Sequence, residues 1–205
     1  MRFLNDTDKV LLRAAIRAAE AGTHGEIVTV VARASGDYFY YPTLWAALAA
    51  MVSPTLLLGL PFDLAALGIV EMQLALFVIL VLLLRLPALK MLFVPRAVQR
   101  LHAARRAREQ FFVHKLHTTH ERSGVLLFVS VAEGYVELLA DAGIHAKVPA
   151  GTWDKIVAEL TTHVRAGKIG KGFVEAVNAI GAQLATHFPA AGVNHNELPN
   201  HLIEL

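Results

Sequence analysis

The stretch Val125-Leu126-Leu127-Phe128-Val129-Ser130-Val131, introduced by Ser123-Gly124, decides how the surrounding chain is read. It is apolar on both faces, which is typical of a strand covered from both sides. The triplet Ala132-Glu133-Gly134 then predicts a turn, and residues 135–140 predict a hairpin partner strand. The sequence therefore places a buried strand with a neighbouring strand at this point.

Helical patterns flank this hairpin. Downstream, apolar residues at helical spacing predict one helix that ends near Gly167 and a second that is stopped by Pro189. Upstream, a basic helix is predicted from about Val98 to His117. The residues assigned to its apolar face are Leu101, Ala104, Phe111 and Leu116.

The N-terminal residues 1–41 supply a helix and a strand. Asn5 or Asp6 can cap a helix that runs to about Ala21, and Glu26 to Ala32 is a second strand pattern that is apolar on both faces. One helix and one strand bury too little surface to fold alone. We therefore expect residues 1–41 and 96–190 to share one α/β core, a small sheet flanked by helices, followed by a tail at 191–205.

The segment between these two parts, residues 42–95, carries only four charged residues. Two runs are long enough to span a bilayer as helices, about 43–60 and about 68–86, with a turn predicted at 60–63. This pattern favours a two-helix transmembrane hairpin that interrupts the α/β domain. The alternative is a helical hairpin buried in a soluble core. Trp45, Tyr38, Tyr40 and Tyr41 lie where an aromatic belt is expected.

Basic residues predict the orientation. The short connection between the two spans has none, whereas the stretch after the second span is rich in them. The positive-inside rule then places both termini in the cytoplasm, as for a two-pass protein of a bacterial inner membrane. The basic residues in question are Arg85, Lys90, Arg96, Arg100, Arg105, Arg106, Arg108, Lys115 and Arg122.

Composition narrows the function. The 205 residues are 55% hydrophobic, carry a formal net charge of +2 and include no cysteine. The lack of cysteine excludes disulfides, thiol catalysis and thiolate zinc sites. The apolar excess disfavours a disordered or nucleic-acid-binding chain, so the expected partners are the lipid bilayer and other membrane proteins, with a homo-oligomer left open.

The run from Ser123 to Ser130 resembles the TPM domain, which occurs in bacterial membrane proteins and in chloroplast proteins tied to photosystem repair. Its hairpin turn, the segment 140–144, the pairs Val148-Pro149 and Trp153-Asp154, and Phe173 also resemble this family, as does the segment 23–27. The resemblance covers about residues 5–35 and 105–190. It implies a small sheet flanked by helices.

Some family members are reported to act as acid phosphatases or to bind divalent metal through acidic residues near strand ends. Glu26 and Asp141 are the candidate metal ligands here, and Ca²⁺ or Mg²⁺ is the expected ion, because hard cations prefer oxygen ligands. Each acid could instead be a turn or cap residue. A second hypothesis, a metal site at His114, His117 and His120, competes with a solvated basic helix end.

No Walker loop, GxGxxG, HExxH or GxSxG motif is present. The sequence therefore favours a membrane-anchored cytoplasmic TPM-like module with a partner-binding or regulatory role. The alternative is a metal-dependent hydrolase that resembles an acid phosphatase.

Overall fold

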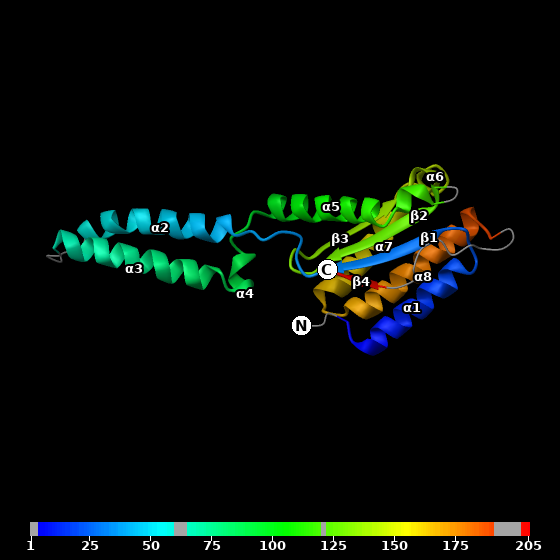
Figure 1. Ribbon diagram of the computed structural model, residues 1–205, viewed down its shortest axis with the longest axis horizontal. Coiled ribbons are helices and arrows are strands. Elements are labelled where there is room, and N and C mark those ends of the chain that lie inside the picture. The colour runs from blue at the N-terminus through cyan, green and yellow to red at the C-terminus, as the bar shows by residue number, and fades with distance from the viewer. Residues whose placement is uncertain (1–3, 60–64, 120–121, 191–201) are drawn as a thin grey trace. The chain divides into compact units, whose positions relative to one another are not determined.

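The computed structural model describes residues 4–59, 65–119, 122–190 and 202–205 (Figure 1). The chain divides into two compact units. One joins residues 1–35 to residues 100–205, and the other comprises residues 36–99. The first unit is an α/β fold, a four-stranded mixed sheet flanked by helices, which confirms the predicted fold class.

The sheet has the strand order β3-β2-β1-β4. Its strands are β1 (Glu26–Ala32), β2 (Gly124–Ser130), β3 (Tyr135–Ala140) and β4 (Leu202–Glu204). β1 runs parallel to β2 and to β4, whereas β2 and β3 form the predicted antiparallel hairpin. The two halves of the sequence therefore meet at the β1–β2 pair, where Glu26 lies opposite Gly124 and Ala32 lies opposite Ser130.

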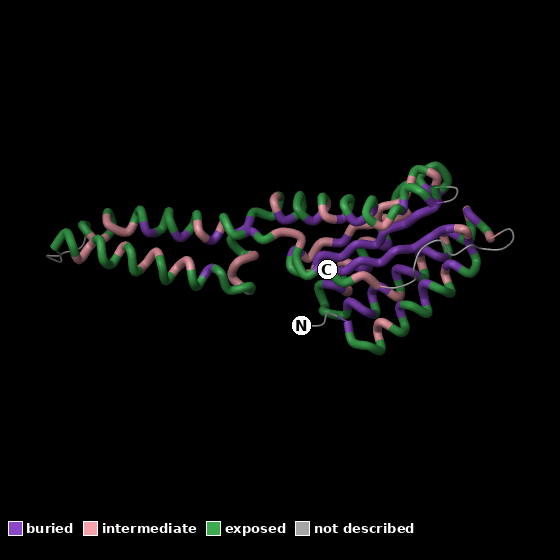
Figure 2. Tube along the Cα trace, viewed as in Figure 1, coloured by how far each residue is buried: buried purple, intermediate pink, exposed green. Residues whose placement is uncertain are grey.

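Every residue of β1 and of β2 is buried, as the two-sided apolar patterns predict. Figure 2 shows these two strands as buried (purple) stretches of the tube inside the first unit. On one face, Ile27, Val125 and Leu127 belong to the larger apolar core, together with side chains of α1, α7 and α8. On the other face, Val28 and Leu126 belong to a smaller core that α5 covers.

The larger core is closed by α1 (Asp6–Glu20), α7 (Thr152–Arg165) and α8 (Ile169–His187), and the short α6 (Ala142–His145) connects β3 to α7. The Asn5 side chain accepts a hydrogen bond from the Asp8 amide at 2.6 Å, so the predicted cap of α1 is present. The helices α1 and α8 approach very closely, since a β-carbon on Gly181 would lie 2.5 Å from the β-carbon of Ala19.

The basic helix α5 (Arg96–Val113) ends four residues before the predicted end at His117. Lys115 adopts a left-handed conformation with φ of 55°, and the one-turn helix η1 (Leu116–Thr118) follows. The predicted apolar face was wrong at Leu101, which is 68% exposed. Phe111 faces the sheet as predicted, Ala107 lies beside it in the smaller core, and Ala103 is also buried. This face of α5 packs on the sheet because its alanines are small, which lets the helix lie close to the strands.

β4 was not predicted as a strand. It pairs with β1 from Thr29 to Val31, and the Lys9 ammonium donates to the Glu204 carboxylate at 2.9 Å. Residues 191–201 of the predicted tail lie outside the described residues.

The second unit contains α2 (Tyr40–Leu58), α3 (Ala66–Leu84) and the short α4 (Pro87–Lys90). α2 and α3 pack against each other, and both are long and apolar enough to cross a membrane. In the most apolar window of each helix only 17% and 6% of the residues are buried, which argues against core helices of a soluble domain. The turn predicted at 60–63 falls outside the described residues.

Polar contacts fasten the open end of this hairpin. The Trp45 indole donates to the Phe93 carbonyl at 3.0 Å, and the Lys90 ammonium donates to the Asp37 carbonyl at 2.7 Å. The Arg85 guanidinium lies 4.5 Å from the centroid of the Phe39 ring, a cation–π contact. The aromatic residues near this end therefore have defined partners.

Candidate functional site

The two predicted metal ligands occupy one row at one end of the sheet. Glu26 pairs with Gly124 across β1 and β2, and the Asp141 amide donates to the Gly124 carbonyl at 3.0 Å from the far side. Side chains alternate between the faces of a strand, so Glu26 and Asp141 share the face that α5 covers. Two strand spacings separate the backbones of these acids, roughly 10 Å.

A backbone oxygen stands between the two acids. The Leu116 carbonyl oxygen approaches Gly124 so closely that a β-carbon there would lie only 2.5 Å from it. The left-handed Lys115 turns the chain so that η1 reaches the sheet at this point. The sequence does not indicate that the Leu116 carbonyl lies here. Every residue has a backbone carbonyl, and only the tertiary structure determines which one points at the acids.

One carboxylate oxygen of Asp141 has a structural role, and the other has no hydrogen-bond partner among the described residues. Its Oδ1 accepts a hydrogen bond from the Ala142 amide at 2.7 Å and so caps the short helix α6. Its Oδ2 is buried and has no hydrogen-bond partner in the described part of the chain. A buried carboxylate oxygen without a partner is costly, so a cation at this position would be stabilising.

The donor chemistry of the row fits a hard cation. Glu26, which is 2% exposed, and Asp141 supply carboxylates, and Leu116 supplies a carbonyl; these are the ligand types of Ca²⁺ and Mg²⁺. Within residues 4–59, 65–119, 122–190 and 202–205, no three His, Asp or Glu side chains gather as a ligand set. A bound ion would therefore complete its shell with the carbonyl and with water.

A different acid serves the opposite end of the sheet. Glu133 accepts a hydrogen bond from the Ser35 amide at 2.8 Å and another from the Ser130 hydroxyl, while the Ser35 hydroxyl donates to Ser130 at 2.7 Å. Glu133 is 6% exposed. These bonds tie the end of β1 to the β2–β3 turn, so we assign Glu133 to structure.

The α5 side of β3 carries a coupled pair. The Tyr135 hydroxyl donates to the Glu137 carboxylate at 3.0 Å. Burial raises the pKa of Tyr135 to about 12, with a further contribution from the Glu137 charge. Burial also raises the pKa of Glu137, and the Tyr135 hydrogen bond and the Arg108 charge oppose this effect. No pattern in the sequence indicates this pair.

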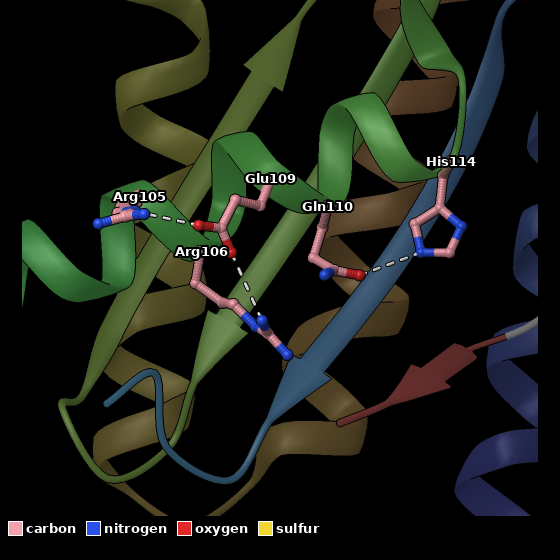
Figure 3. Close-up of polar contacts among 5 residues, drawn as sticks. All are labelled: Arg105, Arg106, Glu109, Gln110 and His114. Carbon is pink, nitrogen blue, oxygen red and sulfur yellow. Dashed lines mark hydrogen bonds and ion pairs between the residues drawn. The ribbon is translucent and has the colours of Figure 1, made fainter. Parts of the chain in front are cut away.

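The histidines near the end of α5 do not form a ligand set among the described residues. His114 contacts the Gln110 side chain at 3.2 Å (Figure 3). The His117 ring lies 5.2 Å from the Phe112 ring. His120, the third member of the hypothesis, lies outside the described residues.

Comparison with known protein families identifies the domain to which these elements belong. Residues 89–183 match the TPM domain family. The chain contains a TPM domain. The match spans α5, β2, β3 and α7 and ends within α8, and the structure shows that α1 and β1 complete the same sheet from outside the matched residues. The predicted resemblance to this family is therefore confirmed.

A solved structure has a similar fold. The NMR structure of the BA42 protein from the psychrophilic bacterium Bizionia argentinensis superimposes with a TM-score of 0.61. The alignment covers 99% of this chain and 96% of BA42, at 19% sequence identity. Identity at this level supports similarity of fold alone. No curated protein matches the chain.

Proposed function

We propose that this protein is a TPM module anchored in a lipid bilayer by the α2–α3 hairpin. The observation that carries the proposal is the apolar surface of the hairpin, which has large apolar side chains exposed along both helices. In water this surface would be unfavourable, whereas in hydrocarbon it is the expected one. The exposed residues include Leu44, Leu48, Met51, Leu56, Leu67, Leu74, Val78, Ile79 and Leu82.

The charge pattern supports an orientation with both termini in the cytoplasm of a bacterial cell. Basic residues are concentrated after α3, and cytoplasmic flanks of spans are enriched in Lys and Arg. A domain held at the inner membrane meets chiefly other membrane proteins. We therefore propose that the TPM domain binds or regulates such partners.

Thiol labelling tests the anchor and its orientation together, because the chain has no cysteine of its own. Ala65→Cys places a thiol at the exposed N-terminal boundary of α3, and Ala158→Cys places one on the exposed face of α7. In intact cells, a membrane-impermeant reagent should modify Cys at 65 and spare Cys at 158. Ser123 is fully buried and so unsuitable for labelling. The reverse labelling pattern would refute the orientation, and release of the protein by alkaline carbonate would refute the anchor.

The Glu26–Asp141 row favours a second candidate function, a metal-dependent hydrolase that resembles an acid phosphatase. When bound, Ca²⁺ or Mg²⁺ would polarise a phosphoryl oxygen as a Lewis acid. Glu26 and Asp141 would hold the ion, and the Leu116 carbonyl would face it from η1.

Calorimetry and a hydrolysis assay separate this candidate from the first. Titration of the purified protein with Ca²⁺ and with Mg²⁺ should give binding that Asp141→Asn weakens. Asn keeps an oxygen for the Ala142 amide, and Glu109→Gln on the exposed face of α5 is the matched control. Cation-dependent hydrolysis of a phosphomonoester that Asp141→Asn abolishes would favour the enzyme. A lack of binding by the wild-type protein would rule out a metal-dependent one.

A further inference from the structure

One face of α5 carries an apolar side chain at each end and two basic side chains between them. Leu101, Arg105, Arg108 and Phe112 follow the spacing i, i+4, i+7, i+11, which places them on one stripe of a helix. Leu101 is 68% exposed and Phe112 is 61% exposed. The stripe lies beside the face of α5 that packs on the sheet through Ala107 and Phe111, and its members Arg108 and Phe112 border β3.

The charges on α5 are unbalanced. The helix has five arginines and one glutamate. Glu109 accepts from Arg105 Nε at 3.1 Å and from Arg106 at 3.4 Å, as Figure 3 shows. Arg108 lies close enough to Tyr135 and Glu137 of β3 for its charge to lower the pKa of both, with no direct hydrogen bond to either, and the Arg105 side chain remains 79% exposed. Both guanidinium groups on the stripe can therefore accept an anionic ligand.

An apolar hollow adjoins the stripe. Phe111 and Phe112 of α5 line it together with Leu139 and Ala140 of β3, and Arg108 completes its wall. A guanidinium beside an apolar hollow suits a ligand that joins an anionic group to hydrocarbon. Phospholipids have this chemistry, because a glycerol backbone links their phosphate to their acyl chains.

From these observations we infer that the α5 stripe binds the surface of an anionic bilayer. Arg105 and Arg108 would bind lipid phosphates, which match the planar guanidinium group, while Leu101 and Phe112 enter the headgroup region. This inference rests on the proposed anchor. α5 begins 12 residues after α3 ends, so an extended connection reaches about 40 Å at most and keeps the stripe near the membrane.

Depth measurements on single-cysteine variants test the inference. A nitroxide at Leu101→Cys reports the stripe, and one at Ala158→Cys on the exposed face of α7 is the control. The full-length protein is reconstituted in nanodiscs of phosphatidylcholine, with or without about a third of phosphatidylglycerol. We expect the label at 101 to be shielded from a water-soluble relaxation agent only in the anionic discs, and the label at 158 to be accessible in both.

Neutralising the arginines should reverse the shielding. Each basic residue contributes roughly fivefold to binding at an anionic surface, so Arg105→Gln with Arg108→Gln should weaken the surface-bound state about thirtyfold. Lys155→Gln with Arg165→Gln, on exposed positions of α7, removes the same charge and should have no effect.

Other outcomes would overturn the inference. Equal accessibility at 101 in the two lipids, or shielding that survives loss of both arginines, would refute binding to anionic lipid. Shielding that appears only when an acidic protein is added would assign the stripe to a protein partner. Failure of the anchor is distinguishable, because the protein would then not integrate into either disc.

Discussion

The Leu116 carbonyl oxygen lies only 2.5 Å from the position that a β-carbon on Gly124 would take. A glycine is therefore required here by the close approach of η1 to the sheet. The same contact places the carbonyl between Glu26 and Asp141.

Gly124→Ala should destabilise the α/β unit. The added methyl must push η1 away from β2, and overpacking of this kind costs about 1–3 kcal/mol. The matched control is Gly22→Ala, whose β-carbon would meet only the Ala185 β-carbon at 3.9 Å. Thermal unfolding followed by Trp153 fluorescence should show a lower midpoint for the first variant. Equal midpoints for the two variants would contradict the close contact.

Glu133→Ala should loosen the junction between β1 and the β2–β3 turn. The Ser35 amide and the Ser130 hydroxyl lose their acceptor, and hydrogen bonds to a charged group contribute roughly 1.5–3 kcal/mol. Hydrogen exchange of the Ser35 amide measures the effect directly. Ala132→Gly, at an exposed position of the same turn, is the control. Unchanged protection of that amide in Glu133→Ala would argue against the network.

Glu137→Gln should stabilise the protein at neutral pH and have little effect in acid. Burial raises the pKa of Glu137 above its ordinary 4.5, so the folded state binds this proton more tightly than the unfolded state does. The wild type therefore loses stability as the pH rises through 4.5 and then through the higher pKa of the folded state. Gln lacks this charge and still accepts from Tyr135. Unfolding midpoints at several pH values should diverge above this window, and parallel curves would refute the shift.

Leu74→Arg should impair membrane integration. Leu74 lies near the middle of α3 and is 60% exposed, and a cation at the centre of a span costs about 2.5–3.5 kcal/mol in insertion. The fraction of protein that resists carbonate extraction should fall. Val10→Arg, on a 64% exposed position of α1, should leave that fraction unchanged. Full retention of Leu74→Arg would argue that α3 does not contact lipid.

Local patterns were sufficient to predict much of this fold. Two-sided apolar runs located β1 and β2, and Asn5 located the start of α1, since these signals lie within a few residues of the element they specify. β4 was not predicted because three residues are too few to show an alternating apolar pattern. The strand forms only by pairing with the edge of β1. Leu101 was misassigned because helical periodicity alone cannot say which of two faces meets the sheet.

The candidate site was predictable only in part. Glu26 and Asp141 were identified as acids at strand ends, and strand register brings them to the same row. The Leu116 carbonyl and the Tyr135–Glu137 pair depend on tertiary packing, so no spacing in the sequence points to them.

The Lys90–Asp37 hydrogen bond has a consequence for how the chain folds. It holds the two ends of the α2–α4 segment together, so this segment is built like a domain inserted into a surface loop. The 91 residues between β1 and β2 would cost about 2 kcal/mol more to close than a ten-residue loop, and a preformed insertion offsets that cost. Integration of the hairpin would thus precede and assist pairing of the two central strands. Excising residues 38–89 and joining the ends by a short linker should release the α/β half as an autonomous, water-soluble protein.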